Sequence, residues 1–255
     1  MAVIAIVVRE SRFREKATRF DEAVDRPLRC LVPTDIESKQ LRKELQLAVW
    51  KIVMNPPCHC LPAHRVHSID QPDPALVVAS YAKNAHIRTE GTRNLIAAAQ
   101  AAAAQRFIVQ SIAFAYAPQK PANDGHFLEE RFPGRGSGKP SESSVEPHPE
   151  TDPLDLADPI RSVTVKGAAD MEGQVLSASE LDAIVLRYGF LYGPGTWHEA
   201  PTRKPGLHVD AAAHPALLAI TQGAAGVYNI ADDDSVVSIA KARAELGFDP
   251  RFRLS

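Results

Sequence analysis

Two cysteines and three histidines lie close together in the stretch CHCLPAHRVH, and both residue types bind zinc. They are Cys58, His59, Cys60, His64 and His67. Structural zinc sites use a few ligand spacings, and a Cys-x-Cys pair followed by a histidine four residues later is not one of the common ones. Prolines at positions 56, 57 and 62 instead favour an irregular loop. We therefore expect a loop that carries these side chains rather than a metal site.

Two further groupings near the C-terminus have residue types that could do chemistry. Three carboxylates in a row, Asp232–Asp234, could hold a divalent cation. His208 and Asp210 could form an acid and base pair. An acidic run that directly follows a short apolar strand is more typical of an exposed loop, and we interpret Asp232–Asp234 in that way.

An unusual turn follows the apolar run at residues 184–186. The run stops at Arg187, and the letters YGFLYGPGT then bring glycines, tyrosines and a proline within a few positions. Glycine lets a backbone approach a ligand closely, and it also allows a tight exit from a strand. Both interpretations are open from the turn alone.

The overall composition is that of an ordinary globular protein. The chain has 255 residues, 45% apolar and 24% charged, with a net charge of −2. This balance predicts no general attraction to nucleic acid or to an anionic membrane, and no apolar run approaches the roughly 20 residues that span a bilayer. Three cysteines at irregular spacing and an N-terminus without signal-peptide features predict a cytoplasmic protein.

Glycine is distributed unevenly along the chain. All 14 glycines lie between Gly91 and Gly247, so residues 1–90 contain none. A glycine-rich loop that cradles phosphate needs the residue without a Cβ. The first 90 residues therefore cannot contain such a loop.

The apolar pattern predicts alternating helices and strands. The helix TEGTRNLIAAAQAAAAQ, starting at Thr89 or Thr92, runs straight into a buried strand from Phe107 to about Ile112, which is typical of a parallel α/β sheet. The stretch ALVVAS is a short strand or a helix start. Other expected elements are a strand at Ala2–Val8, helices at about Ser11–Val24 and at Asp35–Met54, a helix in RSVTVKGAADMEGQVLSA, a strand at Ala183–Leu186, a helix in HVDAAAHPALLAITQ, a strand in GVYNIAD and a small helix closed by Gly247.

The long polar excursion at 117–160 has two open interpretations. It is rich in proline and carries glycine, and its part from 134 to 144 is predicted to be mobile. Such a segment either covers a site or is a disordered insert.

Five segments, in the expected order, resemble the extended short-chain dehydrogenase/reductases, also called the NAD-dependent epimerase/dehydratase family. They are EGTRNLIAAAQAAAAQRFIVQS, SIAFAY, VLRYGFLYGPGT, HVDAAAHPALLAI…GVYNIAD and KARAELGFDPRFR. The resemblance covers roughly residues 75–255. It implies a Rossmann-like three-layer fold with a mainly parallel sheet, divided into a divergent N-terminal part (1–74), a Rossmann-like core (75–189) and a small C-terminal substrate-side region (190–255).

The resemblance also implies a cofactor site. In the family, the turn after this strand faces the nicotinamide end of NAD or NADP at the carboxyl edge of the sheet. Tyr188, Gly189, Phe190 and Tyr192 would then contact the cofactor, and Lys166 would bind the nicotinamide ribose. In the family, the segment that corresponds to His208–Asp210 is mainly structural. The resemblance also implies a homodimer, by analogy with other members.

The chain departs from the family pattern at the catalytic positions. The family motif is Tyr-x-x-x-Lys, yet Ser162 stands in the tyrosine position ahead of Lys166, and a serine hydroxyl is far less acidic. The catalytic serine position falls on Ile112, with Ser111 one residue early. The glycine-rich diphosphate loop is absent as well.

Two functions are therefore open. The first is an NAD(P)-dependent oxidoreductase or epimerase-like enzyme that acts on a small, sugar-derived substrate, with a non-standard catalytic set at Ser111, Ser162 and Lys166. The second is a catalytically silent relative that acts as a binding or regulatory protein.

Overall fold

The computed structural model describes residues 5–9, 31–33, 74–119, 146–159, 161–196, 198–234 and 236–254. The predicted helices at 11–24 and 35–54, the Cys/His stretch and the segment 134–144 lie outside these residues. None of the described helices is both long and apolar enough to cross a bilayer.

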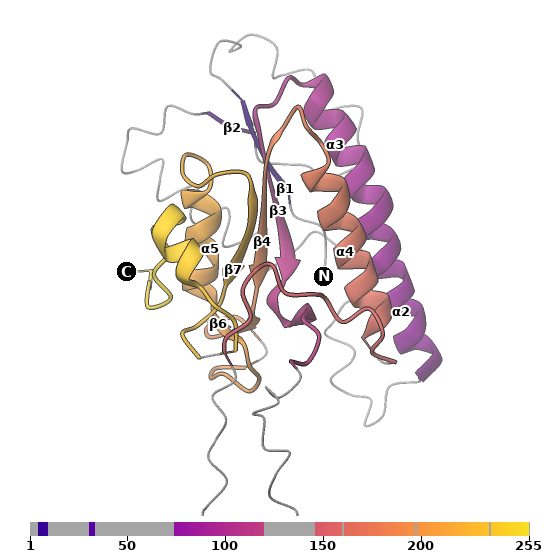
Figure 1. Cartoon of the computed structure of the whole chain (residues 1–255), viewed down its shortest axis with the longest axis vertical. Coiled ribbons are helices and arrows are strands. Elements are labelled where there is room, and N and C mark those ends of the chain that lie inside the picture. The colour runs from indigo at the N-terminus through magenta and orange to yellow at the C-terminus, as the bar shows by residue number, and fades with distance from the viewer. Residues whose placement is uncertain are drawn as a thin grey trace, which may run out of the picture.

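A five-stranded sheet forms the middle layer of the molecule (Figure 1). Its strands, in spatial order, are β2 (Leu31–Pro33), β1 (Ala5–Arg9), β3 (Arg106–Ile112), β4 (Asp182–Tyr188) and β7 (Gly226–Ile230). β3, β4 and β7 run parallel to one another, β2 runs parallel to β1, and β1 runs antiparallel to β3. The sheet is therefore mainly parallel, as predicted.

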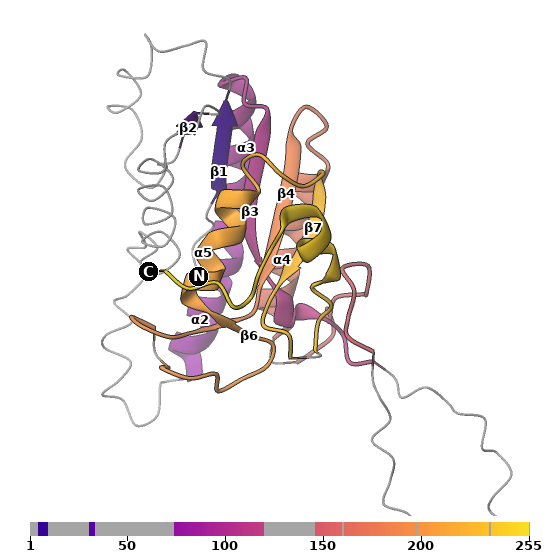
Figure 2. The same ribbon diagram turned by 90° about the vertical axis from the view of Figure 1, so that its left-hand side faces the viewer.

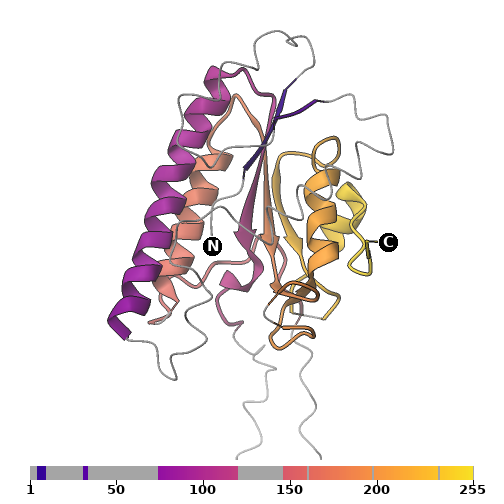
Figure 3. The same cartoon turned by 180° about the vertical axis from the view of Figure 1, so that it is seen from behind.

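Helices cover both faces of this sheet, so the predicted three-layer α/β architecture is confirmed. Figures 1 and 3 show one face covered by α2, α3 and α4, and the other by α5 and a short C-terminal helix. The bounds are α2 (Pro74–His86), α3 (Thr92–Ala101), α4 (Ser162–Leu176), α5 (Val209–Leu218) and the short helix Ala242–Leu246. β7, within the predicted C-terminal region, pairs with β4 of the core.

The first covering helix begins earlier than the sequence predicted. A single turn of π-helix, Ile87–Gly91, joins α2 to α3 without a break, and Gly91 itself has helical angles. Thr89 does not start a helix, because it lies inside this turn; its hydroxyl donates to the Ala85 carbonyl one turn back, at 2.6 Å. The stretch ALVVAS is accordingly helical rather than a strand.

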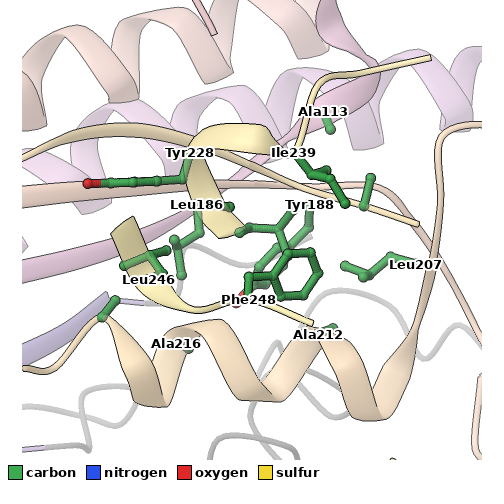
Figure 4. Packing of buried hydrophobic residues seen from close by; sticks show 14 of the residues in the cluster. Ala113, Leu186, Tyr188, Leu207, Ala212, Ala216, Tyr228, Ile239, Leu246 and Phe248 are labelled. Atoms are coloured by element: carbon green, nitrogen blue, oxygen red, sulfur yellow. The ribbon is translucent and has the colours of Figure 1, made fainter. Parts of the chain in front are cut away.

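The two faces of the sheet carry separate apolar cores. Phe107, Val109 and Val185 pack with Met171 and Val175 of α4. On the other face, Tyr188 and other sheet residues pack against α5 and the C-terminal segment, as Figure 4 shows around Phe248 and Leu207. At about 25 cal/mol per Å² of buried apolar surface, this burial is the main force that holds the layers together.

A small parallel pair of strands lies beyond the carboxyl ends of β4 and β7. It consists of β5 (Phe190–Tyr192) and β6 (Gly206–His208). Figure 2 shows β6 below the main sheet, close to the start of α5. The turn singled out in the sequence is therefore the link from the main sheet into this second pair.

Candidate functional site

A row of polar side chains crosses the sheet near the carboxyl ends of three parallel strands. Ser111 pairs in register with Arg187, and Arg187 pairs with Asn229. All three are at most 5% exposed. The Ser111 hydroxyl donates to Glu172 Oε1 of α4 at 2.5 Å, and Arg187 bonds the same carboxylate at 2.6 Å. The predicted catalytic serine is thus held inside a buried ion pair.

The network continues from Arg187 to the segment after β3. Arg187 donates to the Tyr116 hydroxyl at 2.7 Å, and this hydroxyl donates to Asn229 Oδ1 at 2.7 Å. Burial raises the pKa of Tyr116, although the Arg187 charge partly opposes the shift. Burial alone would lower the pKa of Arg187, but hydrogen bonding and charge attraction from Glu172 raise it overall. Tyr116 is therefore a neutral phenol beside a permanent cation.

The predicted cofactor-facing residues at the end of β4 have three different surroundings. Tyr188 pairs with Ile112 and is buried on the α5 side of the sheet, where burial raises its pKa. A Cβ on Gly189 would lie 2.7 Å from the Pro205 carbonyl oxygen. Phe190 stacks face to face on Phe114, with ring centroids 4.0 Å apart. The tips of β3 and β4 therefore lie together, and Phe190 continues that contact beyond the strands.

Phe190 also borders an open hollow of about 190 Å³ at this edge of the sheet. The aromatic and basic side chains that line it include Phe114, Tyr116, His148, Arg161, Phe190 and Lys204. Arg161 is held by Asp155 and Asp158 at 2.8 and 2.9 Å, so its charge is largely neutralised. Parallel α/β sheets usually bind ligands at the carboxyl ends of their strands, and this hollow lies at that edge.

Tyr192 and His208 form a second contact, between β5 and β6. Their rings meet edge to face at 5.3 Å. Burial, together with a hydrogen bond to Asp232, raises the pKa of Tyr192 to about 12. Gly193 has a positive φ of 106°, and a Cβ there would lie 2.7 Å from His208 Nε2. Gly193 therefore gives His208 the room that it occupies.

His208 and Asp210 stabilise the start of α5. His208 Nδ1 accepts a hydrogen bond from the Asp210 backbone N–H at 3.2 Å, so it caps the helix. In the acidic run, Asp234 accepts from the Gly206 backbone and Asp233 pairs with Arg243. Within the described ranges, no cluster of His, Cys, Asp or Glu has an arrangement that could hold a metal ion.

Ser162 and Lys166 lie in the first part of α4. Ser162 is the first residue of the helix and is partly buried, whereas Lys166 is exposed. The buried side of this part of the helix carries Val165 and Ala168, which pack with Ile112 in one small apolar cluster. Among the described residues, Lys166 has no hydrogen-bond or ion-pair partner. The structure therefore brings Ser111 and Phe190 to the same sheet edge and leaves Lys166 in solvent.

Five of the aromatic and basic residues that line the hollow were not predicted from the sequence, namely Phe114, Tyr116, His148, Arg161 and Lys204. Phe114 and Tyr116 lie in the SIAFAY segment, where neither was given a role, and His148 lies in the polar excursion at 117–160, for which two interpretations stayed open. One signal was available, since His148 and Asp152 form a histidine–carboxylate pair four residues apart in the letters HPETD. That pattern is too common to select a site without the fold.

Comparison with known proteins supports the expected fold. The chain is 34% identical over 195 residues to a protein of a Streptomyces species that is named a 3-diazoavenalumate denitrifying reductase. The match covers 69% of this chain and 55% of that relative, so the chain spans about half of the relative's length. No protein-family profile matches the sequence.

Solved structures resemble the chain at lower identity. The UDP-glucose 4-epimerase of Thermotoga maritima, solved with UDP-glucose, is 18% identical with a TM-score of 0.50, over 72% of this chain and 70% of that one. A dTDP-glucose 4,6-dehydratase of Streptomyces venezuelae, solved with NAD, is 15% identical with a TM-score of 0.48, over 72% and 67%. The Rossmann-like fold expected from the sequence is confirmed.

Proposed function

We propose that this chain, which has the fold of the NAD-dependent epimerase/dehydratase family of short-chain dehydrogenase/reductases, is an NAD(P)-dependent oxidoreductase that acts on a small molecule. The observation that carries the proposal is the hollow at the carboxyl ends of β3 and β4, where Phe190 and Phe114 form an aromatic wall. Sheets of this kind bind nucleotides at that edge. The name of the Streptomyces relative supports a reductase.

The residues at this edge fit the nicotinamide end of the cofactor. A flat aromatic wall and a hollow of about 190 Å³ that is open to solvent suit a planar ring. When bound, NAD(P)H supplies a hydride, that is, two electrons and one proton. The diphosphate half must be held without a glycine-rich loop, because residues 1–90 contain no glycine. We therefore expect weaker binding than such a loop gives.

The substrate side of the hollow favours a molecule with an acidic group. Lys204 lines the hollow, and the Arg203 guanidinium lies over the Phe190 ring at 5.5 Å. A carboxylate or phosphate would be attracted to these cations, and an aromatic or sugar ring could pack against the wall that Phe114 and Phe190 form together. Two substrate classes should be tested. Aromatic acids can be represented by benzoic acids that carry a diazonium or an aldehyde group, and sugar nucleotides by UDP-glucose.

Ser111, Ser162 and Lys166 remain the proposed site residues from the family resemblance, with Lys166 as the ribose contact. If Lys166 contacts the ribose, Lys166→Ala weakens nucleotide binding. Lys83→Ala, which removes an exposed lysine from a different helix, α2, leaves nucleotide binding unchanged. Equal dissociation constants for wild type and Lys166→Ala would remove the ribose assignment.

The experiment that tests the function is a titration of the purified chain with NAD⁺, NADH, NADP⁺ and NADPH. Binding is followed by the tryptophan fluorescence of the chain for all four nucleotides, and also by nicotinamide fluorescence for the two reduced ones. Saturable binding below about 1 mM, or about −4 kcal/mol, supports the oxidoreductase. The absence of binding by all four supports a catalytically silent binding protein. One observation favours that second function, since the Ser111 hydroxyl is already engaged by Glu172.

A further inference from the structure

His148, which lines the hollow, is paired with the carboxylate of Asp152. His148 Nδ1 lies 2.7 Å from Asp152 Oδ2. The His148 and Asp152 side chains are 14% and 26% exposed, so the contact is largely shielded from water. The hydrogen bond from His148 is the main cause that lowers the pKa of Asp152. An ionised carboxylate can only accept a hydrogen bond, so the proton in the hydrogen bond between His148 and Asp152 must be on Nδ1.

The position of His148 is fixed from several sides. Its backbone N–H donates to the Val236 carbonyl at 3.0 Å, and its carbonyl accepts from the Ser238 N–H at 2.9 Å. The Asn229 amide donates to the same carbonyl at 3.1 Å. The imidazole stacks on the Tyr116 ring, with centroids 4.9 Å apart and planes 5° from parallel. The ring therefore cannot turn freely.

These contacts leave one nitrogen for a ligand. With Nδ1 bound to Asp152, the second ring nitrogen, Nε2, is the atom that can exchange a proton. It forms no hydrogen bond within the described part of the chain, and His148 lines the hollow with Phe114 and Phe190. A histidine whose Nδ1 is held by a carboxylate is the arrangement that orients an imidazole for general acid and base catalysis.

We propose that His148, oriented by Asp152, is the general acid and base of the reaction in the hollow, taking the part that a tyrosine would play in the family motif. This rests on the proposed oxidoreductase function. In the reduction of a carbonyl, the carbon gains a hydride from NAD(P)H and its C=O π bond breaks. The oxygen takes the proton from Nε2–H of the imidazolium, which becomes neutral imidazole. The products are an alcohol and NAD(P)⁺, and the reverse reaction uses Nε2 as the base.

A spectroscopic test examines the geometry without any substrate. In the full chain labelled with ¹⁵N-histidine, at a pH where the ring is neutral, His148 should show a protonated Nδ1 and an unprotonated Nε2. The His148→Asn spectrum identifies the signal by its loss. A neutral ring with the proton on Nε2 and none on Nδ1 would overturn the proposal. Nδ1 would then accept a hydrogen bond from Gln119 Nε2, which lies 3.3 Å away, instead of donating one to Asp152.

A kinetic test then separates catalysis from structure. In His148→Asn, the asparagine amide can replace Nδ1–H as the donor to Asp152, but nothing replaces Nε2. With NADPH and a carboxybenzaldehyde as probes, we expect this variant to bind NADPH as wild type does and to lose about 10²- to 10⁴-fold in kcat. His86→Asn, at an exposed histidine of α2, should change neither value.

The outcomes distinguish the two proposals. A wild-type chain that binds no nicotinamide nucleotide would overturn the proposed function, and the proton-transfer role with it. A wild-type chain that binds and turns over, beside a His148→Asn variant with an unchanged kcat, would overturn the role of His148 alone.

Discussion

The Ser111 hydroxyl donates a hydrogen bond to Glu172, and the same carboxylate forms a buried ion pair with Arg187. Both charged side chains are only 6% exposed. A buried pair of this kind does not by itself prove stability, but removing one partner leaves an uncompensated charge. The candidate site is therefore built beside a network that the fold needs.

We predict that Glu172→Gln lowers the free energy of unfolding by about 3–5 kcal/mol, because the Arg187 guanidinium stays buried without its counter-charge. Ser111→Ala removes only one hydrogen bond to that carboxylate and should cost less, about 1.5–3 kcal/mol. Glu180→Gln changes an exposed glutamate in the turn after α4 and should be neutral. Urea unfolding measures all three. Equal losses for Glu172→Gln and Glu180→Gln would contradict the structural role of the pair.

Gly189 provides a second prediction, which concerns backbone packing. A Cβ there would lie 2.7 Å from the Pro205 carbonyl oxygen and 2.8 Å from that of Gly206. Because both atoms are backbone, β6 would have to move, and Phe190 would move with it. We expect Gly189→Ala to destabilise the fold by about 1–3 kcal/mol, as overpacking does.

Gly173 supplies the matched control for this experiment. It lies inside α4, where a Cβ would meet no atom within 4 Å. Gly173→Ala should therefore stabilise the chain by about 0.5–1 kcal/mol, since alanine favours helix. Thermal unfolding of the two variants should shift the midpoint in opposite directions. A midpoint for Gly189→Ala at or above the wild-type value would show that the close approach is not required.

The two ends of the helix–strand unit at residues 89–112 differ in how well the sequence predicts them. The strand at Phe107–Ile112 was predictable because a continuous apolar run between a helix and a turn has few other solutions, and the structure extends it by only one residue. Of the two predicted starts, Thr92 is the first residue of α3, whereas Thr89 lies inside the π-helical turn before it. Neither residue caps a free helix end, because helical backbone runs on from α2 through this turn.

The hollow was harder to predict. Phe114 follows β3, His148 lies in the polar excursion and Phe190 follows β4, so only tertiary packing brings them together. Gly189 shows the same limit in another form. The sequence left open whether this glycine serves a close approach or a tight exit from the strand, and it could not indicate that the chain's own carbonyls at Pro205 and Gly206 lie there.

His214 on α5 predicts how stability depends on pH. Its ring stacks on Phe252 at 4.2 Å, and its buried Nδ1 has no hydrogen-bond partner among the described residues. Burial lowers the pKa of His214 below 6.5, so the unfolded chain takes up a proton before the folded one does. Stability is then complete above about pH 6.5 and falls as the pH drops toward the folded-state pKa.

The variant His214→Phe keeps a ring on Phe252 and removes the titration. We expect its free energy of unfolding to fall less than that of wild type when the pH is lowered from 7 to 5.5, with part of the slope remaining because burial also lowers the pKa of His208. Urea unfolding across that pH range measures both slopes. Identical slopes for variant and wild type would contradict the assignment to His214.

Phe190 links the fold to the proposed function. Its ring is held from one side by Phe114 at 4.0 Å and lies beneath the Arg203 guanidinium at 5.5 Å, so it is a rigid wall of the hollow. Leucine at this position keeps apolar bulk but loses the ring stack that holds Phe114 in place, a contact of about 0.5–1.5 kcal/mol, and with it the flat aromatic wall. Phe190→Leu should therefore raise the dissociation constant of NADPH by up to about tenfold. Phe252→Leu, which disrupts the aromatic stack on His214 instead, should leave that constant unchanged, and fluorescence titration of both variants measures the difference. If the two variants weaken NADPH binding equally, the effect comes from general loosening of the fold, and Phe190 does not form the wall against which the nicotinamide ring rests.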